Sequence, residues 1–145
     1  MFAKRTFVGI MGIPLLMSRG NGHIGYDDVV PLLMAACPSH AGSRECASVE
    51  EGEFVRVLGF VRHLIRLLHE GRVQSFTRVF GVVEWILADG EPAAIDLIQA
   101  GFLADLTDPE VYQGTSVRLA DFGPWLGARA RGDPEIRRLL GDEAP

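Results

Sequence analysis

The chain contains little lysine and little cysteine, and both shortages limit what it can be. Lys4 is the only lysine among 14 basic residues in a chain of 145, a bias that fits a GC-rich genome. Cys37 and Cys46 are the only cysteines, too few for a disulfide framework. One disulfide closing a short loop stays open for an oxidising compartment, but we expect reduced thiols in a cytoplasmic protein.

The chain also lacks the short motifs of common enzyme and cofactor sites. It has no phosphate loop, no dinucleotide fingerprint, no serine-hydrolase elbow and no HExxH pair. The glycine-rich stretch Gly20-Asn21-Gly22 is too short for a phosphate loop. We therefore expect no cofactor, no metal and no catalytic activity.

No segment alternates apolar and polar residues as a half-buried strand does. Apolar residues instead recur at three- and four-residue steps in two segments, about Glu51–Glu70 and Ser75–Ala88. A further helix is expected from Pro92 through Leu106. Since helical periodicity occurs without any strand pattern, the sequence predicts an all-α fold. The links between the middle helices are short, so neighbouring helices should pack antiparallel. We expect a compact bundle or a short stack of antiparallel helical hairpins, with about five to six helices.

The first long segment is the strongest helix of the chain. Its expected core positions are Phe54, Val57, Leu58, Val61, Leu64, Ile65 and Leu68. His63 and His69 fall outside this stripe, on different faces of the helix. We therefore expect both histidines at the surface, beside Arg62 and Arg66.

Capping residues and proline define the shorter elements. Asp27 or Asp28 is expected to cap a helix that ends before Pro38, since a carboxylate accepts the free amide hydrogens of a first turn. Residues 38–49 are small, polar and aperiodic, which predicts a loop. Asp133-Pro134 is expected to cap and start a final helix.

The N-terminal part differs from the rest of the chain. Lys4 and Arg5 precede the apolar run Phe7–Met17, which imitates a signal peptide, but no small-x-small cleavage site follows. The run is also too short to span a bilayer. We therefore interpret residues 1–23 as an N-terminal extension or arm and residues 24–145 as a single helical domain.

Negative charge is concentrated in one part of the chain. The net charge is −5, and residues 79–117 hold seven acids without any Lys, Arg or His. These acids are Glu84, Asp89, Glu91, Asp96, Asp105, Asp108 and Glu110. General nucleic-acid binding needs a basic stripe, so this distribution argues against it.

A negative field of this kind attracts a basic partner and speeds its approach. The seven acids are therefore candidate partner-binding residues, with a solvated helical face as the alternative. Trp85 and Trp125 join them as candidates, because an exposed Trp beside acids is typical of an interface hot spot. Both tryptophans could equally lie in the core or in a groove. Glu84 could act in catalysis if buried, but it fits better at a helix edge or beside an arginine.

The histidines and cysteines offer two candidate chemical sites. Cys37, His40 and Cys46, with His23 as a fourth ligand, could bind zinc, but their spacing matches no common zinc pattern. Cys37 could be a nucleophile activated by His40, although nothing in the sequence supplies an orienting third group. A helix-terminal cysteine followed by an exposed loop is the favoured interpretation.

Four segments carry a further signal, and they are Tyr26–Leu33, Leu67–Gly71, Gly101–Leu106 and Phe122–Gly127. In this order they resemble a family of small bacterial helical proteins of unknown function. The resemblance covers roughly residues 24–130 and implies an all-α domain. Members of the family are often suspected to be immunity proteins of polymorphic toxin systems. Where an acid is usual in the family this chain has Ala104, and it has no Trp-rich segment after the Leu-Gly motif.

Together these features favour a non-catalytic protein-binding module in the cytoplasm. Our first hypothesis is an immunity-type inhibitor whose acidic helical face blocks the basic cleft of a toxin, such as a nuclease that binds phosphate backbones. The alternative is a helical scaffold or regulatory protein that binds a peptide in an apolar groove. An enzyme with an unfamiliar site is the third hypothesis.

Overall fold

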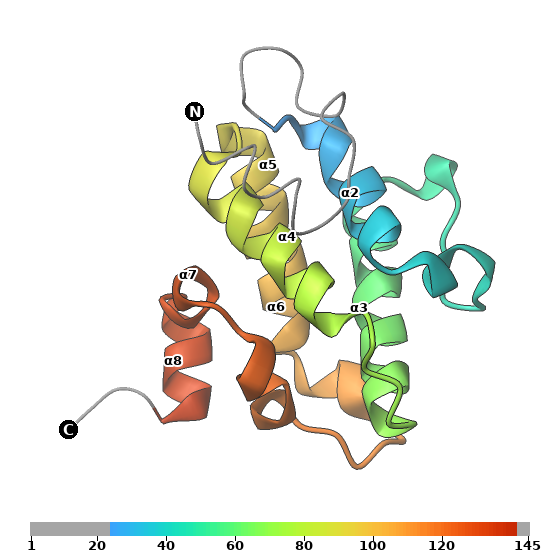
Figure 1. Ribbon diagram of the computed structural model, residues 1–145, viewed down its shortest axis with the longest axis vertical. Helices are drawn as coiled ribbons and strands as arrows, with labels where there is room; N and C mark the ends of the chain where they lie inside the picture. The colour runs from blue at the N-terminus through green and yellow to red at the C-terminus, as the bar shows by residue number, and fades with distance from the viewer. Residues whose placement is uncertain (1–23, 142–145) are drawn as a thin grey trace.

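The computed structural model describes residues 24–141, and these residues form an all-α fold (Figure 1). The α-helices are α2 (Val29–Ala36), α3 (Glu53–His69), α4 (Phe76–Asp89), α5 (Pro92–Asp96), α6 (Ala104–Leu106), α7 (Ala128–Arg131) and α8 (Pro134–Leu140). The 3-10 turns are η2 (Tyr26–Asp28), η3 (Pro38–Gly42), η4 (Val49–Glu51), η6 (Pro109–Tyr112) and η7 (Leu119–Trp125). No strand occurs in this range, where Ile24 and Gly90 form an isolated bridge.

The expected extension or arm, residues 1–23, lies outside the described residues, and so does its apolar run Phe7–Met17. Within residues 24–141, none of the helices has the length and apolar character that crossing a membrane requires. The all-α prediction is confirmed.

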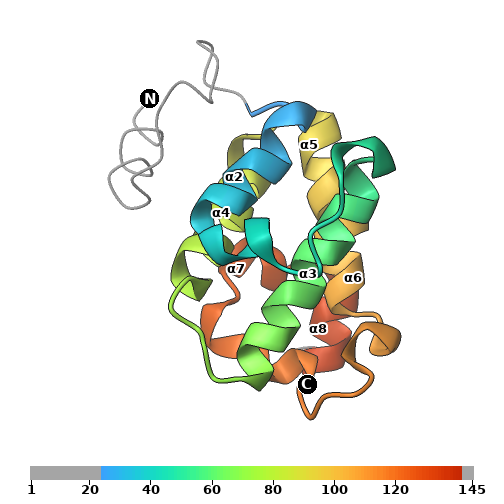
Figure 2. The same ribbon diagram turned by 90° about the vertical axis from the view of Figure 1, so that its right-hand side faces the viewer.

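Figures 1 and 2 show that α3 and α4 run in opposite directions, as the short link between them requires. Helix α2 packs against α4, and α7 covers another part of α4. Helix α3 packs against the long helix that begins with α5. Helix α4 is therefore covered by α2, from the N-terminal part of the described residues, and by α7, from the C-terminal part.

Five phenylalanines from four elements form the centre of the core. They are Phe60 of α3, Phe76 and Phe80 of α4, Phe102 of the long helix and Phe122 of η7. The ring centroid of Phe80 lies 5.8 Å from those of both Phe102 and Phe122. Because each buried aromatic ring removes roughly 150–250 Å² from water, this cluster holds the C-terminal turn η7 against the central helices.

The long helix from Pro92 to Leu106 is continuous, as expected, but its middle is not α-helical. Residues Leu97–Leu103 form a π-helical segment, η5, between α5 and α6. Gly101 of this segment is buried, and an added Cβ there would lie 3.2 Å from Cδ1 of Phe54. A wide turn with a glycine therefore lets the Phe54 ring lie directly on the helix backbone.

Two expectations about α3 are wrong. Phe54 was placed in the apolar stripe, but it is 43% exposed, because it precedes the part of α3 that the core covers. His63 was expected at the surface, but it is 1% exposed. Its side chain is buried because the segment after α2 folds back over α3 and supplies polar partners. His69, as expected, is exposed.

The two expected helix caps differ in outcome. Asp133 caps α8, since its Oδ2 accepts hydrogen bonds from the backbone N of Glu135 and of Ile136, both at 3.2 Å. Asp28 occupies the cap position of α2 without capping it. Its Oδ2 accepts instead from the backbone N of Gly25 at 2.9 Å and closes the preceding 3-10 turn. The expected loop 38–49 contains η3 and the start of η4.

Gly59 is the position where the segment 43–48 crosses α3. A Cβ at Gly59 would overlap the backbone carbonyl oxygen of Glu45. The missing side chain therefore allows the backbone at Glu45 to lie directly on the helix, which brings the Glu45 carboxylate within reach of α3 side chains.

We expect Gly59→Ala to lower the free energy of unfolding by about 1–3 kcal/mol, since the backbone at Glu45 must shift to admit the methyl group. Gly42→Ala is the matched control, because nothing lies within 4 Å of the Cβ position at Gly42. Urea denaturation measures both. Equal stability of the two variants would contradict the close approach of segment 43–48 to α3.

Candidate functional site

The seven candidate acids are spread along α4, the long helix and η6, and they do not form one compact site. Glu91, Asp96, Asp108 and Glu110 are exposed, whereas Glu84, Asp89 and Asp105 are partly buried. Their distribution therefore leaves some acids facing solvent and gives others a role inside the protein.

Glu84 holds the C-terminal part of the chain on α4. Its Oε1 accepts a hydrogen bond from the backbone N of Arg129 at 2.9 Å, and its Oε2 accepts from the backbone N of Ala130 at 2.8 Å. These amides belong to the first turn of α7, whose free N–H groups favour a carboxylate. A Cβ at Gly127 would overlap the Glu84 side chain. This carboxylate therefore caps α7 across a long stretch of sequence.

The two candidate tryptophans lie in the packed part of the molecule. Trp85 is 6% exposed and belongs to the core. Trp125 is partly buried, and its ring meets Phe76 edge-on with centroids 5.0 Å apart. Trp125 thus anchors the end of η7 on α4.

Asp105 is the candidate acid with the most altered chemistry. Burial first, and then the neighbouring Asp108 carboxylate, raise its pKa to about 6, although Arg62 on α3 acts in the opposite direction. Asp105 therefore lies between the surface of α3 and the end of the long helix, at a point where a new cation would stabilise its charged form.

Apolar residues are exposed next to the acid-bearing helix. Phe54 and Val55 are each 43% exposed at the start of α3, and Val49 before them is 70% exposed. Phe54 lies on Gly101 of η5. We call Phe54, Asp96, Ala100, Gly101, Ala104 and Asp105 the Phe54 face.

The residues of the Phe54 face share a helix side by their spacing. Asp96 and Asp105 lie about one helical turn before and after Gly101, so they flank the position that Phe54 covers. Ala100 and Ala104 are exposed and small. The helix that Phe54 contacts at Gly101 therefore carries small residues and two carboxylates within about one turn of that contact.

A second polar site, which sequence patterns do not reveal, lies between α3 and the segment that crosses it. Glu45 accepts hydrogen bonds from Arg66 Nε at 2.6 Å, from Arg66 Nη2 at 3.1 Å and from His63 Nδ1 at 3.0 Å. The Glu45 side chain is 11% exposed. Burial acts to raise the pKa of Glu45, but the hydrogen bonds from Arg66 and His63 outweigh it and lower the pKa to about 2.

The other ring nitrogen of His63 meets a serine. Ser39 Oγ lies 2.8 Å from His63 Nε2, and Ser39 is exposed on η3. His40, next to Ser39, is buried against the rings of Phe60 and His63, at centroid distances of 5.1 and 5.2 Å. Burial first, and then the charge of His63, lower the pKa of His40 to about 4, so His40 is neutral at pH 7. The fold therefore assembles a Ser39–His63–Glu45 chain of hydrogen bonds.

Neither cysteine is in a disulfide, and one of them adjoins Ser39. Cys37 and Cys46 are free thiols, and Cys37 is fully buried. The thiol of Cys37 lies 3.6 Å from Ser39 Oγ. Within residues 24–141, no three His, Cys, Asp or Glu side chains are placed to hold a metal ion, and His23 lies outside that range.

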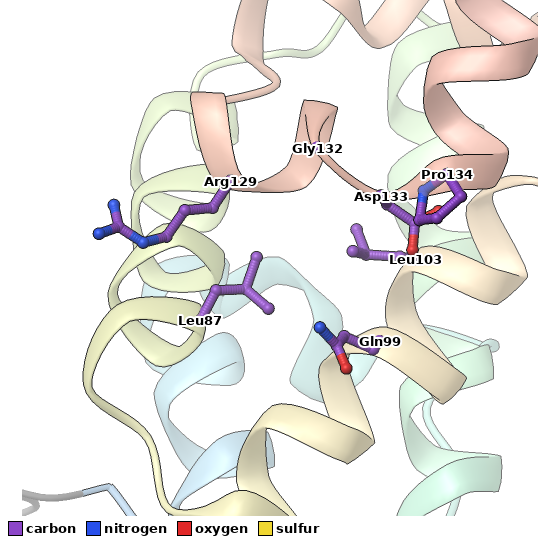
Figure 3. Close-up of a pocket in the computed structure, with 7 residues that line it drawn as sticks. All are labelled: Leu87, Gln99, Leu103, Arg129, Gly132, Asp133 and Pro134. Atoms are coloured by element: carbon purple, nitrogen blue, oxygen red, sulfur yellow. The ribbon is translucent and has the colours of Figure 1, made fainter.

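A shallow pocket of about 300 Å³ lies where α7 and α8 meet the central helices (Figure 3). Its walls include Leu87 of α4, with Gln99 and Leu103 of η5. Arg129 extends away from the other labelled side chains, and Asp133 is occupied as the cap of α8. The pocket therefore gathers no group of reactive side chains.

Residues 30–138 match the sequence profile of a family described as a domain of unknown function (DUF7674), and the chain belongs to this family. No curated protein and no solved structure matches the chain. The family match agrees with the extent of the resemblance seen in the sequence and assigns no activity.

The lowered pKa of Glu45 makes a prediction about acid stability. The stabilisation from ionised Glu45 is complete above its ordinary pKa of 4.5 and is lost as the pH falls towards 2. We expect Glu45→Gln to remove up to about 3 kcal/mol of unfolding free energy at pH 7, and to flatten the loss of stability below pH 4.5.

Glu70→Gln is the control for this measurement. Glu70 also contacts Arg66, but it is exposed, and surface ion pairs contribute little to stability. Denaturation curves between neutral and acidic pH separate the two variants. If Glu45→Gln kept the acid dependence of the wild type, the network would not stabilise the fold in the way described.

Proposed function

We propose that this protein is a protein-binding module and that the Phe54 face is its partner-binding surface. The observation that carries the proposal is the placement of half-exposed Phe54 on Gly101, on a helix that carries Asp96 and Asp105 about one turn before and after that glycine. Burial of an aromatic ring stabilises a folded protein. A half-exposed ring that lies on Gly101 therefore suits a binding role.

The chemistry of the face indicates the kind of partner. Buried aromatic anchors supply most of the binding energy at interfaces, whereas charges around them set specificity and association rate. Asp96 and Asp105 would meet basic side chains around an apolar contact at Phe54. Exposed Ala100 and Ala104 allow a partner backbone or a flat side chain to approach the helix closely.

The specific form of the proposal is an immunity-type inhibitor of a bacterial toxin, acting in the cytoplasm. The acidic face would occupy a basic catalytic cleft and block access of the substrate. Support comes from the resemblance to suspected immunity proteins and from the absence of basic residues over residues 79–117. Glu91, Asp108 and Glu110, exposed on the same part of the chain, extend the negative field.

One observation favours the alternative of a scaffold that binds a peptide in an apolar groove. A pocket of about 360 Å³ lies between the end of α6, η6 and α8. Its walls include Leu106, Tyr112, Val117 and Leu119, and it is bordered by Leu139, which is 44% exposed. An amphipathic segment could place an apolar side chain there.

Phe54→Ala and the double variant Asp96→Asn/Asp105→Asn test the proposal together. We expect Phe54→Ala to weaken partner binding by about 2 kcal/mol, roughly thirtyfold, as loss of an interface anchor does. The double variant should reduce the salt dependence, because it removes two of the negative charges near the anchor. The measurement is affinity capture of tagged protein from the native host at low and moderate salt, followed by titration of the captured partner.

Leu139→Ala is the matched control, since Leu139 and Phe54 have almost the same exposure on different helices. It should leave partner binding unchanged. Loss of binding in Leu139→Ala but not in Phe54→Ala would favour the apolar groove. Capture of no protein by the wild type, or equal binding by all variants, would contradict the proposal.

A further inference from the structure

Ser39, His63 and Glu45, which meet where η3 and the segment 43–48 cover α3, have the connectivity of a nucleophile, a general base and an orienting carboxylate. Ser39 Oγ lies 2.8 Å from His63 Nε2, and Glu45 Oε1 lies 3.0 Å from His63 Nδ1. The three residues come from η3, α3 and the segment between them. They satisfy the geometry required of an activated nucleophile.

From this geometry we propose that Ser39 is a nucleophilic serine that attacks carboxylic esters, with His63 as its general base and Glu45 as the positioning residue. The inference concerns a different part of the molecule from the Phe54 face and does not depend on the proposed binding function. It assigns a reaction to residues that no sequence motif connects.

The shorter contact at His63 Nδ1 assigns the protons. Glu45 Oε1 lies 3.0 Å from Nδ1 and can only accept, so Nδ1 carries a hydrogen and donates it to Glu45; Arg66 Nη2, 3.3 Å from Nδ1, then donates to Glu45 Oε1 at 3.1 Å. In the neutral imidazole, Nε2 then has a free lone pair and accepts from the Ser39 hydroxyl. The Cys37 thiol, 3.6 Å from Ser39 Oγ, can donate to the serine oxygen on its other side. This arrangement directs the serine proton towards the base.

The charges around His63 hold the network in this state. Glu45 is ionised at neutral pH, because Arg66 donates to both of its oxygens. The groups that face His63 are Glu45, Arg66, Ser39 and the ring of His40. Since His40 is neutral at pH 7, Glu45 and Arg66 are the charged groups in direct contact with the base.

Ser39 and His63 differ in their exposure to solvent, as a nucleophile and its base should. Ser39 is exposed on a short turn that begins with Pro38, whereas His63 is 1% exposed. Ser39 therefore lies at the surface, with the buried base on its inner side. A purely structural hydrogen bond between Ser39 and His63 would not require Ser39 to be exposed to solvent.

The proposed reaction has two balanced halves. Ser39 Oγ forms a bond to the ester carbonyl carbon, its proton moves to His63 Nε2, and the C–O bond to the alcohol breaks as the alcohol takes that proton. Water then attacks the acyl-serine and gives a proton to His63 Nε2. The acid leaves, and Ser39 Oγ regains its proton from the histidine.

The test is covalent labelling of the full-length protein with a fluorophosphonate, in which Ser39 Oγ displaces fluoride from phosphorus. We expect one adduct per chain by intact mass, located on Ser39 by peptide mapping. Ser39→Ala should abolish it, and His63→Gln should slow it by about a hundredfold or more, as loss of a general base does. Circular dichroism establishes that each variant is folded.

Ser43→Ala is the matched control. The Ser43 hydroxyl lies in the same turn region and donates to the His40 carbonyl oxygen at 2.8 Å, away from His63 Nε2. It should label like the wild type. Folded wild-type protein that gives no Ser39 adduct, or labelling that is equal in Ser39→Ala, would overturn the proposal without affecting the Phe54 face.

Rescue by a conservative variant tests the positioning role of Glu45. Glu45→Ala should slow labelling of folded protein, because no oxygen then accepts from His63 Nδ1. Glu45→Gln should restore part of the rate, since its amide oxygen can still accept that hydrogen bond. Folded Glu45→Ala that labels at the wild-type rate, or no recovery in Glu45→Gln, would remove Glu45 from the mechanism.

Discussion

The N-terminal half of the described structure depends on the ion pair and hydrogen bonds of the partly buried Glu45 carboxylate. Glu45 lies on α3 because Gly59 leaves room for its backbone, and it pairs with Arg66 and His63 of that helix. Removing one partner from such a network leaves a charge in a poorly solvated place, which costs more than the pair contributes in isolation. His63 also contacts the 3-10 turn η3, through a hydrogen bond to Ser39 and a ring contact with His40.

The sequence predicted the architecture well where apolar periodicity decides structure. Helices α3 and α4, the long helix from Pro92 and the Asp133 cap of α8 follow from spacing and capping chemistry. The π-helical turn at Gly101 was not predictable in this way, since its widened turn accompanies the seating of a ring from another helix. Tertiary contacts of this kind override local propensity.

The candidate site residues show the same division between features that sequence patterns predict and features that tertiary contacts decide. Charge counting identified the acids, but it could not separate exposed Asp96 from Glu84, which caps α7 across more than forty positions. His63 was misplaced because its partners come from an aperiodic segment, and a stripe of apolar residues says nothing about a polar group covered by another part of the chain. The only available signal was the small residue Gly59 on the same helix, which indicates a close backbone approach. The two proposed sites therefore rest on contacts that only the folded chain brings together.

The central claim is that the Phe54 face is where a partner binds. The most direct measurement replaces Phe54 with a photo-crosslinking benzoylphenylalanine in the native host and identifies the protein joined to it on irradiation. Arg137, exposed on α8, is the comparison position. The account requires one discrete adduct from position 54, with basic partner residues at the crosslink and a yield that falls as salt rises. No adduct from position 54, or the same products from position 137, would contradict it.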